Sequence, residues 1–395
     1  MRFFKKDFGN KNLIVLDIGS QFVKALLLEV DKNEKRGTLL AWARENFVDD
    51  FDKLCLNCQR AIRKAENKAG IKAKEIFLGI EGDTLKGSST TFCCKRENPK
   101  EKIDLTELKY IIQKVQWKAF EKIRKEFSSE TGTPETEIRL VSAHIVDIKV
   151  DNSHLANPLG FQGENICISI FNNYTSIKLL EDLIKLVAYL GLDLIGINSP
   201  SYALFRCLDL DHSAKEDTLI IDVGGKNTEI TLIKGGGELI EARNFHLGGH
   251  LFTRTIAEFL DMGTEEAEAV KIKYSKEGVS AEAKKRIEKL MSSNLFSWGG
   301  GVKVVLDELL KKYRVMPSKI FLCGGGSNLP IIKDVLRKRM NLKANHISPS
   351  EIIKIKNKTK FEEIPSLALA ALVLESLEIN EFSATLKRAV RLIQG

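Results

Sequence analysis

The sequence predicts an α/β protein built of two similar lobes, with a small α+β subdomain inserted into the first. At 395 residues, the chain is longer than one hydrophobic core usually supports. A unit of apolar strand, aspartate, glycine turn and second strand occurs twice, roughly 200 residues apart, which indicates a weak internal repeat. Between the two copies, residues 83–163 are more polar and contain loop signals, which indicates an insertion.

The repeated unit comprises residues 13–30 in the first half of the chain and residues 218–233 in the second. In each copy an aspartate, Asp17 or Asp222, follows the first apolar strand, and a glycine stands two residues later. Apolar strands joined by a tight glycine-containing turn are typical of β-hairpins. Two such hairpins at equivalent places predict two lobes that face one another.

The other elements follow from hydrophobic periodicity and from glycines that end helices. Strands are expected at residues 75–80, 166–171, 192–196 and 319–322, and helices at 54–70, 105–127, 176–190, 251–260, 265–274, 281–291, 331–340 and 366–377. We accordingly expect residues 12–82 and 164–199 to form the core of lobe I, 83–163 the insert, 200–245 and 318–378 the core of lobe II, 246–317 its second subdomain, and 379–395 a linker and a terminal helix.

The composition is that of an ordinary globular protein, with 43% hydrophobic and 29% charged residues. The net charge of +8 favours an anionic partner, without choosing among nucleotide, lipid headgroup and acidic peptide, and no nucleic acid is expected. No apolar run is long enough to cross a bilayer. The N-terminus lacks the apolar segment of a secretory signal, so we expect a cytoplasmic protein.

Seven cysteines are present, several of them in apolar strand-like segments, and this pattern predicts reduced thiols. Cys55 and Cys58 form a C-x-x-C pair, but a zinc site would require a second matching pair. Cys93 and Cys94 are a poor second pair because neighbours on a strand point to opposite faces. Buried cysteines without a metal are therefore expected.

Three glycine-rich turns, each after an apolar strand, are the candidate binding elements. Glycine lets the backbone approach a phosphate closely, and free N–H groups in such turns attract anions. An aspartate before the turn can hold Mg²⁺ through water, and a lysine can reach a phosphate as a point charge. The candidate residues are Asp17, Gly19, Ser20, Gln21 and Lys24 in the first turn, Asp222, Gly224, Gly225, Lys226 and Asn227 in the second, and Gly324, Gly325, Gly326 and Ser327 in the third, with Asp17 and Asp222 as the metal residues.

Any one of these turns alone is more often a plain turn between strands. All three in this order are similar to the phosphate-1, phosphate-2 and adenosine motifs of the superfamily of actin, DnaK-type chaperones and sugar kinases. Neither a Walker A motif nor a Rossmann glycine pattern is present. The resemblance implies the actin-like two-lobed fold, with ATP and Mg²⁺ bound between the lobes.

Finer features resemble the FtsA family of bacterial division proteins. Residues 246–253 look like that family's entry into its fourth subdomain, and residues 157–163 look like the end of its inserted subdomain. The similarity covers most of residues 12–378 and is strongest over 218–275.

The same resemblance adds residues to the expected nucleotide site. Glu268 and Lys271 match the acid and lysine that contact the ribose in FtsA, and they share a helix face at i and i+3. Gly248 and Gly249 lie at the helix entry before them. The resemblance further implies self-association into filaments, binding of the C-terminal peptide of FtsZ, and a peripheral location on the inner face of the cell membrane.

The second glycine turn departs from the FtsA pattern of three glycines, two threonines and an aspartate. Lys226 replaces the third glycine, Asn227 a threonine and Glu229 the aspartate. Lys226 could add a phosphate contact or disturb the turn. Since no glutamine or glutamate can be assigned to activate water, the sequence predicts at most weak ATPase activity.

The end of the chain has the pattern of a short basic amphipathic helix. Apolar residues fall on one face and basic residues on the other, which is typical of binding to a membrane surface. The expected membrane residues are Leu386, Lys387, Arg388, Val390, Arg391 and Ile393. Packing of this helix on the body of the protein is the alternative.

Two other functions fit parts of the pattern. A PilM-type component of type IV pilus assembly has the same fold, and Ser20 and Lys24 of the first turn resemble it well. Residues 157–163 and the terminal basic helix favour FtsA over PilM. A small-molecule kinase would need a general base near a substrate hydroxyl, and no motif for one is present.

Overall fold

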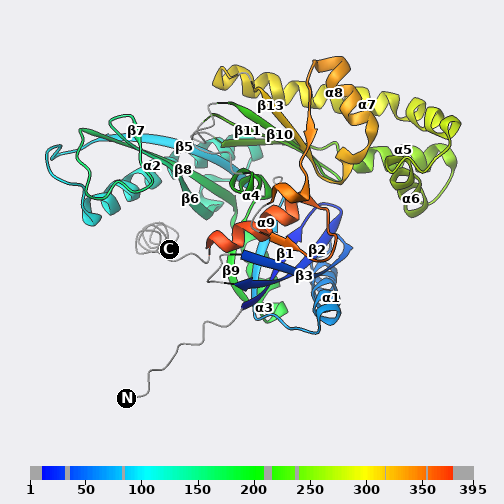
Figure 1. Cartoon of the computed structure of the whole chain (residues 1–395), viewed down its shortest axis with the longest axis horizontal. Helices are drawn as coiled ribbons and strands as arrows, with labels where there is room; N and C mark the ends of the chain where they lie inside the picture. Colours follow the sequence, from blue (N-terminus) through cyan, green and yellow to red (C-terminus); the bar gives the residue numbers. More distant parts are fainter. Residues whose placement is uncertain are drawn as a thin grey trace.

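The computed structural model describes residues 11–31, 36–81, 85–208, 216–235, 240–315, 317–352 and 355–376, and its strands form two sheets. The sheets belong to two lobes that meet along the middle of the molecule, and the insert extends to one side (Figure 1). No helix in these ranges is long and apolar enough to cross a membrane.

Lobe I contains a six-stranded sheet in which the strand order is β15-β3-β2-β1-β4-β9. Its strands are β1 (Lys11–Ile18), β2 (Phe22–Asp31), β3 (Arg36–Asn46), β4 (Glu75–Ile80), β9 (Asp193–Asn198) and β15 (Ile355–Asn357). Helices α1 (Phe51–Ala69) and α3 (Ile177–Leu190) pack on one face, where Cys55 and Cys58 are buried. The hairpin expected at residues 13–30 is confirmed, and its register places Asp17 opposite Lys24.

Lobe II repeats the arrangement of lobe I. Its strands β10 (Thr218–Val223), β11 (Thr228–Ile233), β12 (Ile240–Phe245), β13 (Lys319–Cys323) and β14 (Asn345–His346) are ordered β12-β11-β10-β13-β14. This order corresponds to β3-β2-β1-β4-β9 of lobe I. In each lobe the first two strands form an antiparallel hairpin, and the first strand pairs in parallel with the fourth. The structural repeat thus extends well beyond the two hairpins visible in the sequence.

Residues 355–376 return to lobe I, so the expected assignment of residues 318–378 to lobe II holds for β13 and β14 but is wrong for this last part. Strand β15 pairs with β3, and α9 (Ile364–Ser376) packs between the two sheets beside α4 (Pro200–Cys207). Helix α9 is apolar on every side, so it needs to be covered all round. The lobe I sheet covers one side of α9 and approaches it closely at Gly79 of β4. A Cβ on Gly79 would lie only 2.1 Å from Leu369 Cδ1.

The insert consists of β5 (Lys86–Lys95), α2 (Leu105–Thr131), the 3₁₀ turn Glu135–Glu137, β6 (Ile138–Val150), β7 (Ser153–His154) and β8 (Asn165–Ser176). The expected boundary at residue 163 is too early, because β8 lies between β5 and β6 rather than in the lobe I sheet. The apolar face of the insert's sheet is covered by α2. A run of apolar residues predicts a strand, but it does not identify the strand's neighbours.

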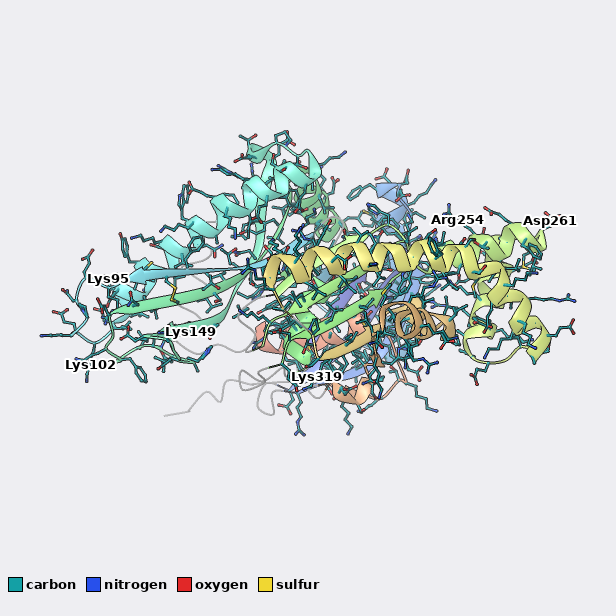
Figure 2. The ribbon with its side chains drawn as sticks, turned by 90° about the horizontal axis from the view of Figure 1, so that it is seen from above. Lys95, Lys102, Lys149, Arg254, Asp261 and Lys319 are labelled. Carbon is teal, nitrogen blue, oxygen red and sulfur yellow. A yellow bond between two sulfur atoms is a disulfide. The ribbon has the colours of Figure 1, made fainter. Side chains whose placement is uncertain are left out.

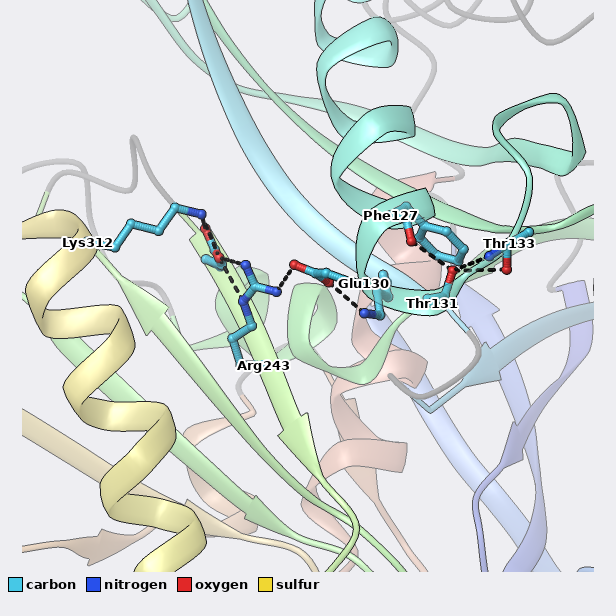
Figure 3. A network of polar contacts seen from close by, with 8 residues as sticks. Phe127, Glu130, Thr131, Thr133, Arg243 and Lys312 are labelled. Carbon is cyan, nitrogen blue, oxygen red and sulfur yellow. Dashed lines mark hydrogen bonds and ion pairs between the residues drawn. The ribbon is translucent and has the colours of Figure 1, made fainter.

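The insert is joined to lobe II at the beginning of β12, where Glu241 pairs with Ser88 of β5. Beside this junction lies a row of alternating charges, Lys312–Glu241–Arg243–Glu130–Lys86, which Figure 3 shows as consecutive ion pairs. Glu241 is buried, and its ion pairs with Arg243 and Lys312 offset the free-energy cost of removing its charge from water. The insert therefore branches from lobe I in sequence but shares a sheet with lobe II.

The remaining helices of lobe II are α5 (Gly249–Leu260), α6 (Thr264–Ser275), α7 (Ala281–Tyr313) and α8 (Pro330–Met340), with 3₁₀ turns at Gly325–Asn328 and Pro349–Glu351. In Figure 2, α7 runs along lobe II, with Lys95 and Lys102 of the insert at one end of the molecule and Arg254 and Asp261 at the other.

Helix α7 continues far beyond its expected end at residue 291, through three consecutive glycines. A Cβ on Gly299 would lie 3.1 Å from Val335 Cγ1, and one on Gly301 would lie 2.6 Å from an atom of the Phe245 ring. The glycines thus permit close packing of α7 on β12 and α8, which outweighs their low helix propensity.

The expectation that all cysteines are reduced is wrong at one place. Cys93 of β5 and Cys167 of β8 are direct partners in the antiparallel register and form a disulfide. The two cysteines are separated by 74 residues in the sequence, so their proximity depends on the pairing of β5 with β8 and could not be predicted from the sequence.

We therefore expect alkylation of the denatured, unreduced protein to modify five cysteines, namely Cys55, Cys58, Cys94, Cys207 and Cys323. Reduction before alkylation should add two further labels, because the disulfide contains the remaining two thiols. Mass spectrometry of the intact protein counts the labels. Seven labels without reduction would show that the disulfide is absent in solution.

Candidate functional site

The three glycine turns meet in a cleft between the lobes, which encloses a cavity of about 340 Å³. The first turn follows β1, the second follows β10 and the third follows β13. Gly324 has φ +82°, and a Cβ there would lie 2.1 Å from Asp222 Oδ1. Only glycine fits this position, since the backbone is left-handed and the space is filled.

Lys24 is the cation of the lobe I wall of the cleft. Its Nζ lies 3.2 Å from Asp17 Oδ2 and 3.5 Å from Glu363 Oε2. Burial lowers the pKa of Lys24, but Asp17, Glu363 and Glu81 outweigh this effect and raise it above the usual value. Lys24 therefore stays charged. The hydroxyl of Ser366, on the returning helix α9, donates a hydrogen bond to Asp17.

Two further carboxyl groups, Asp222 and Glu81, lie in the floor of the cleft. Burial, with the negative charge of Glu81, raises the pKa of Asp222 to about 7. Burial and the charge of Asp17 also raise the pKa of Glu81, which follows β4 directly. Glu81 lies beside the first turn, because a Cβ on Gly19 would be 2.8 Å from its Oε1. More carboxylates than cations surround this end, so it is suited to a ligand that brings its own cation.

The opposite end of the cleft is formed by α5 and α6. Lys271 Nζ lies 2.7 Å from Glu268 Oε2 and donates hydrogen bonds to the carbonyl of Gly249 and to Thr253 Oγ1. Burial lowers the pKa of Lys271, although Glu268 opposes the shift. The predicted Glu268–Lys271 pair is thus present, and both residues line the cavity.

Most of the predicted residues line one cavity, although they come from widely separated segments. The lining includes Asp17, Gly19, Gln21, Lys24, Asp222, Gly224, Gly225, Gly249, Glu268, Lys271, Gly324, Gly325 and Gly326. Ser20, Lys226, Asn227, Gly248 and Ser327 lie beside it without lining it. Gly248 packs under the second turn, where a Cβ would lie 2.6 Å from the carbonyl oxygen of Gly225. The hydroxyl of Ser327 donates to the carbonyl of Gly324 within the third turn.

The side chain of Lys226 points away from the cavity. Its Nζ lies 3.7 Å from Asp49 Oδ1 and 5.3 Å from the centroid of the Phe47 ring, both in lobe I. The second turn keeps its shape, since Gly224 and Asn227 are joined by a backbone hydrogen bond of 2.9 Å. Lys226 therefore neither lines the cavity nor disturbs the turn.

Sequence reasoning missed ten lining residues: Phe22, Arg44, Glu81, Pro200, Ile272, Ser275, Lys276, Asn328, Glu363 and Pro365. One of them, Glu81, could have been predicted, because it directly follows a predicted strand and the carboxyl ends of parallel strands meet at one edge of a sheet. Arg44 is on β3, a strand that was not predicted because its leucine, alanine and arginine content favours a helix. Glu363 reaches the cleft only through the return of the chain to lobe I.

Comparison with known proteins gives consistent results. A sequence profile described as "Cell division protein FtsA" matches residues 219–371. FtsA of Enterococcus faecalis is 23% identical over 348 residues, covering 82% of this chain and 75% of the relative. FtsA of Streptococcus pneumoniae is 21% identical over 359 residues, covering 85% and 75%.

Among solved structures, the PilM–PilN type IV pilus biogenesis complex contains a chain with the same fold. The TM-score is 0.67 at 16% identity, and the match covers 93% of this chain and 99% of that chain. The predicted actin-like fold is thereby confirmed. The chain is thus similar in sequence to the FtsA cell division proteins, and it has the actin-like fold.

Proposed function

We propose that the protein is an FtsA-type division protein that binds ATP with Mg²⁺ in the cleft and links FtsZ to the inner face of the cell membrane. The observation that carries the nucleotide proposal is the meeting of three glycine turns around one cavity, with Lys24 at one end and the Glu268–Lys271 pair at the other. Glycine turns hold phosphates and a charged pair at a helix surface can hold a ribose.

The residues present fit a magnesium nucleotide. The described part of the chain contains no cluster of three or more metal-ligating side chains, so a cation would be held jointly by phosphates, water and the carboxylates of Asp17 and Asp222. The turn glycines would offer backbone N–H groups to the phosphates, and Lys24 would balance part of their charge. Bound ATP–Mg²⁺ would supply negatively charged phosphates and a divalent cation, and Asp17 and Asp222 would balance the charge of the cation.

In this proposal ATP acts mainly as a conformational ligand, with hydrolysis at most weak. A ligand shifts a conformational equilibrium only through different affinities for the two states. The cleft could provide such a difference, because the first and second turns belong to different lobes and would both contact a nucleotide bound in the cavity. Closure around the nucleotide would then favour self-association of the actin-like faces.

Membrane attachment and FtsZ binding rest on the relation to FtsA. The proposed membrane residues Leu386, Lys387, Arg388, Val390, Arg391 and Ile393 lie outside the described residues. A short amphipathic helix binds a membrane weakly, and a polymer would multiply its attachment.

A PilM-like role in type IV pilus assembly is the second candidate, and the structural match to the PilM–PilN complex favours it. Both candidates use the same nucleotide cleft. They differ in partner, since a PilM-like protein would bind a pilus-protein peptide instead of FtsZ.

Co-sedimentation with anionic liposomes and the cognate FtsZ, with and without ATP–Mg²⁺, tests the proposal. We expect the full chain to pellet with liposomes and to recruit FtsZ, and a chain ending at Glu378 to do neither. Pelleting of the truncated chain, together with failure to recruit FtsZ, would contradict the division role and favour the pilus role. Neutral liposomes serve as the control for charge dependence.

A further inference from the structure

The first and second glycine turns are in direct contact across the boundary between the lobes. A Cβ on Gly225 would lie 2.6 Å from Gln21 Cβ, so the two backbones approach closely at this point. The backbone N–H of Lys226 donates a hydrogen bond of 3.1 Å to Ser20 Oγ. This seam, formed by Ser20, Gln21, Gly225 and Lys226, borders the cavity.

The side chain of Lys226 extends the seam to a second segment of lobe I. Phe47 and Asp49 follow β3, and the backbone N–H of Phe47 donates a 2.8 Å hydrogen bond to the carbonyl of Gln21. This bond fixes the segment to the first turn. Lys226 contacts both Asp49 and the face of the Phe47 ring, so it holds the same unit of lobe I that its backbone touches.

These contacts distinguish two possible roles for Lys226, a ligand of phosphate and a contact between the lobes. A phosphate ligand would point into the cavity, as Lys24 does. Lys226 instead uses its charge on the outer side of the seam, where Asp49 is largely exposed to solvent. Glycine, which stands here in the FtsA pattern, has no side chain that could make this connection between the lobes.

We propose that Lys226 is a positioning residue that fastens lobe II to lobe I beside the cleft, so that release of this contact limits how fast nucleotide enters and leaves. The inference rests on the proposed binding of nucleotide. Since an exposed ion pair and a cation–π contact are each weak, their loss should accelerate exchange by about fivefold to tenfold.

The test compares Lys226→Gly and Lys226→Arg with the unmodified chain, using a fluorescent ATP analogue with Mg²⁺ in stopped flow. In Lys226→Gly both the association and the dissociation rate should rise about fivefold to tenfold, which leaves the Kd within about threefold. Arginine should preserve the slow rates, because it also stacks on an aromatic ring and pairs with a carboxylate. Lys360→Gly removes the same charge from another exposed turn and should leave both rates unchanged.

A rise in the dissociation rate alone, with a loss of affinity of about tenfold or more, would identify Lys226 as a phosphate ligand and overturn the proposal. Hydrogen exchange of the nucleotide-free protein gives an independent measure. In Lys226→Gly, amides at residues 47–50 and 224–228 should exchange faster. Unchanged exchange there would also overturn the proposal. If the unmodified chain binds no nucleotide, the proposed function fails, while the exchange data still decide whether Lys226 fastens the lobes.

Discussion

Replacing Lys24 by methionine is expected to weaken binding of ATP–Mg²⁺ by about 100-fold or more, since loss of one partner from a buried charge pair between a protein and its ligand typically costs about 2–5 kcal/mol of binding free energy. Methionine has a similar length but no charge. Its introduction leaves Asp17 and Glu363 without their common cation, at 3.2 and 3.5 Å from the lost Nζ. These carboxylates would then repel the incoming phosphates. Isothermal titration calorimetry at neutral pH measures the affinity.

Lys11→Met is the matched control. Lys11 lies at the other end of β1 and pairs with Glu75 of β4, so the variant removes the same charge from the same sheet, far from the cleft. Its affinity for ATP–Mg²⁺ should stay within about twofold of the unmodified chain, because Lys11 lies at the opposite end of β1 from Asp17 and charges separated by more than about 10 Å are largely screened by salt. Equal affinities of Lys24→Met and Lys11→Met would refute the role of Lys24.

Trp298→Ala is expected to lower the free energy of unfolding of lobe II by about 3–5 kcal/mol. The indole of Trp298 is completely buried in the core that joins α7 to β10 and β11. Its Nε1–H donates a 2.9 Å hydrogen bond to Thr228 Oγ1, at the start of the strand that follows the second glycine turn. The substitution therefore leaves a large cavity behind the cleft and removes one of the two hydrogen bonds of the Thr228 hydroxyl, which still donates to the carbonyl of Leu247.

Urea unfolding followed by far-UV circular dichroism measures this loss. Trp298→Phe should recover most of the packing and cost about 1–2 kcal/mol, mainly for the lost hydrogen bond. Trp117→Ala is the surface control: this side chain is 57% exposed on α2 and its removal should change stability by less than about 0.5 kcal/mol. If Trp298→Ala and Trp117→Ala had the same midpoint, the proposed contribution of the α7 core would be wrong.

The sequence by itself determined the elements whose structure depends on nearby residues. The glycine turns, the aspartates before them and the hairpin that sets Asp17 opposite Lys24 are local features. The helix ends at Gly70 and Gly191 are also local, since each cap has the left-handed backbone that glycine favours. For this reason both the two-lobed architecture and most of the cleft could be predicted.

Only the tertiary structure decided which distant surfaces meet. An apolar helix such as α9 must be covered, but its sequence does not say by which sheet, and its return to lobe I brings Glu363 to Lys24. Strand order likewise decided that β8 completes the insert and that Cys93 faces Cys167. The outward direction of Lys226 depends on Phe47 and Asp49 of the other lobe. Local sequence determines backbone conformation and which residues are buried. Which distant elements contact one another depends on long-range packing and on strand register.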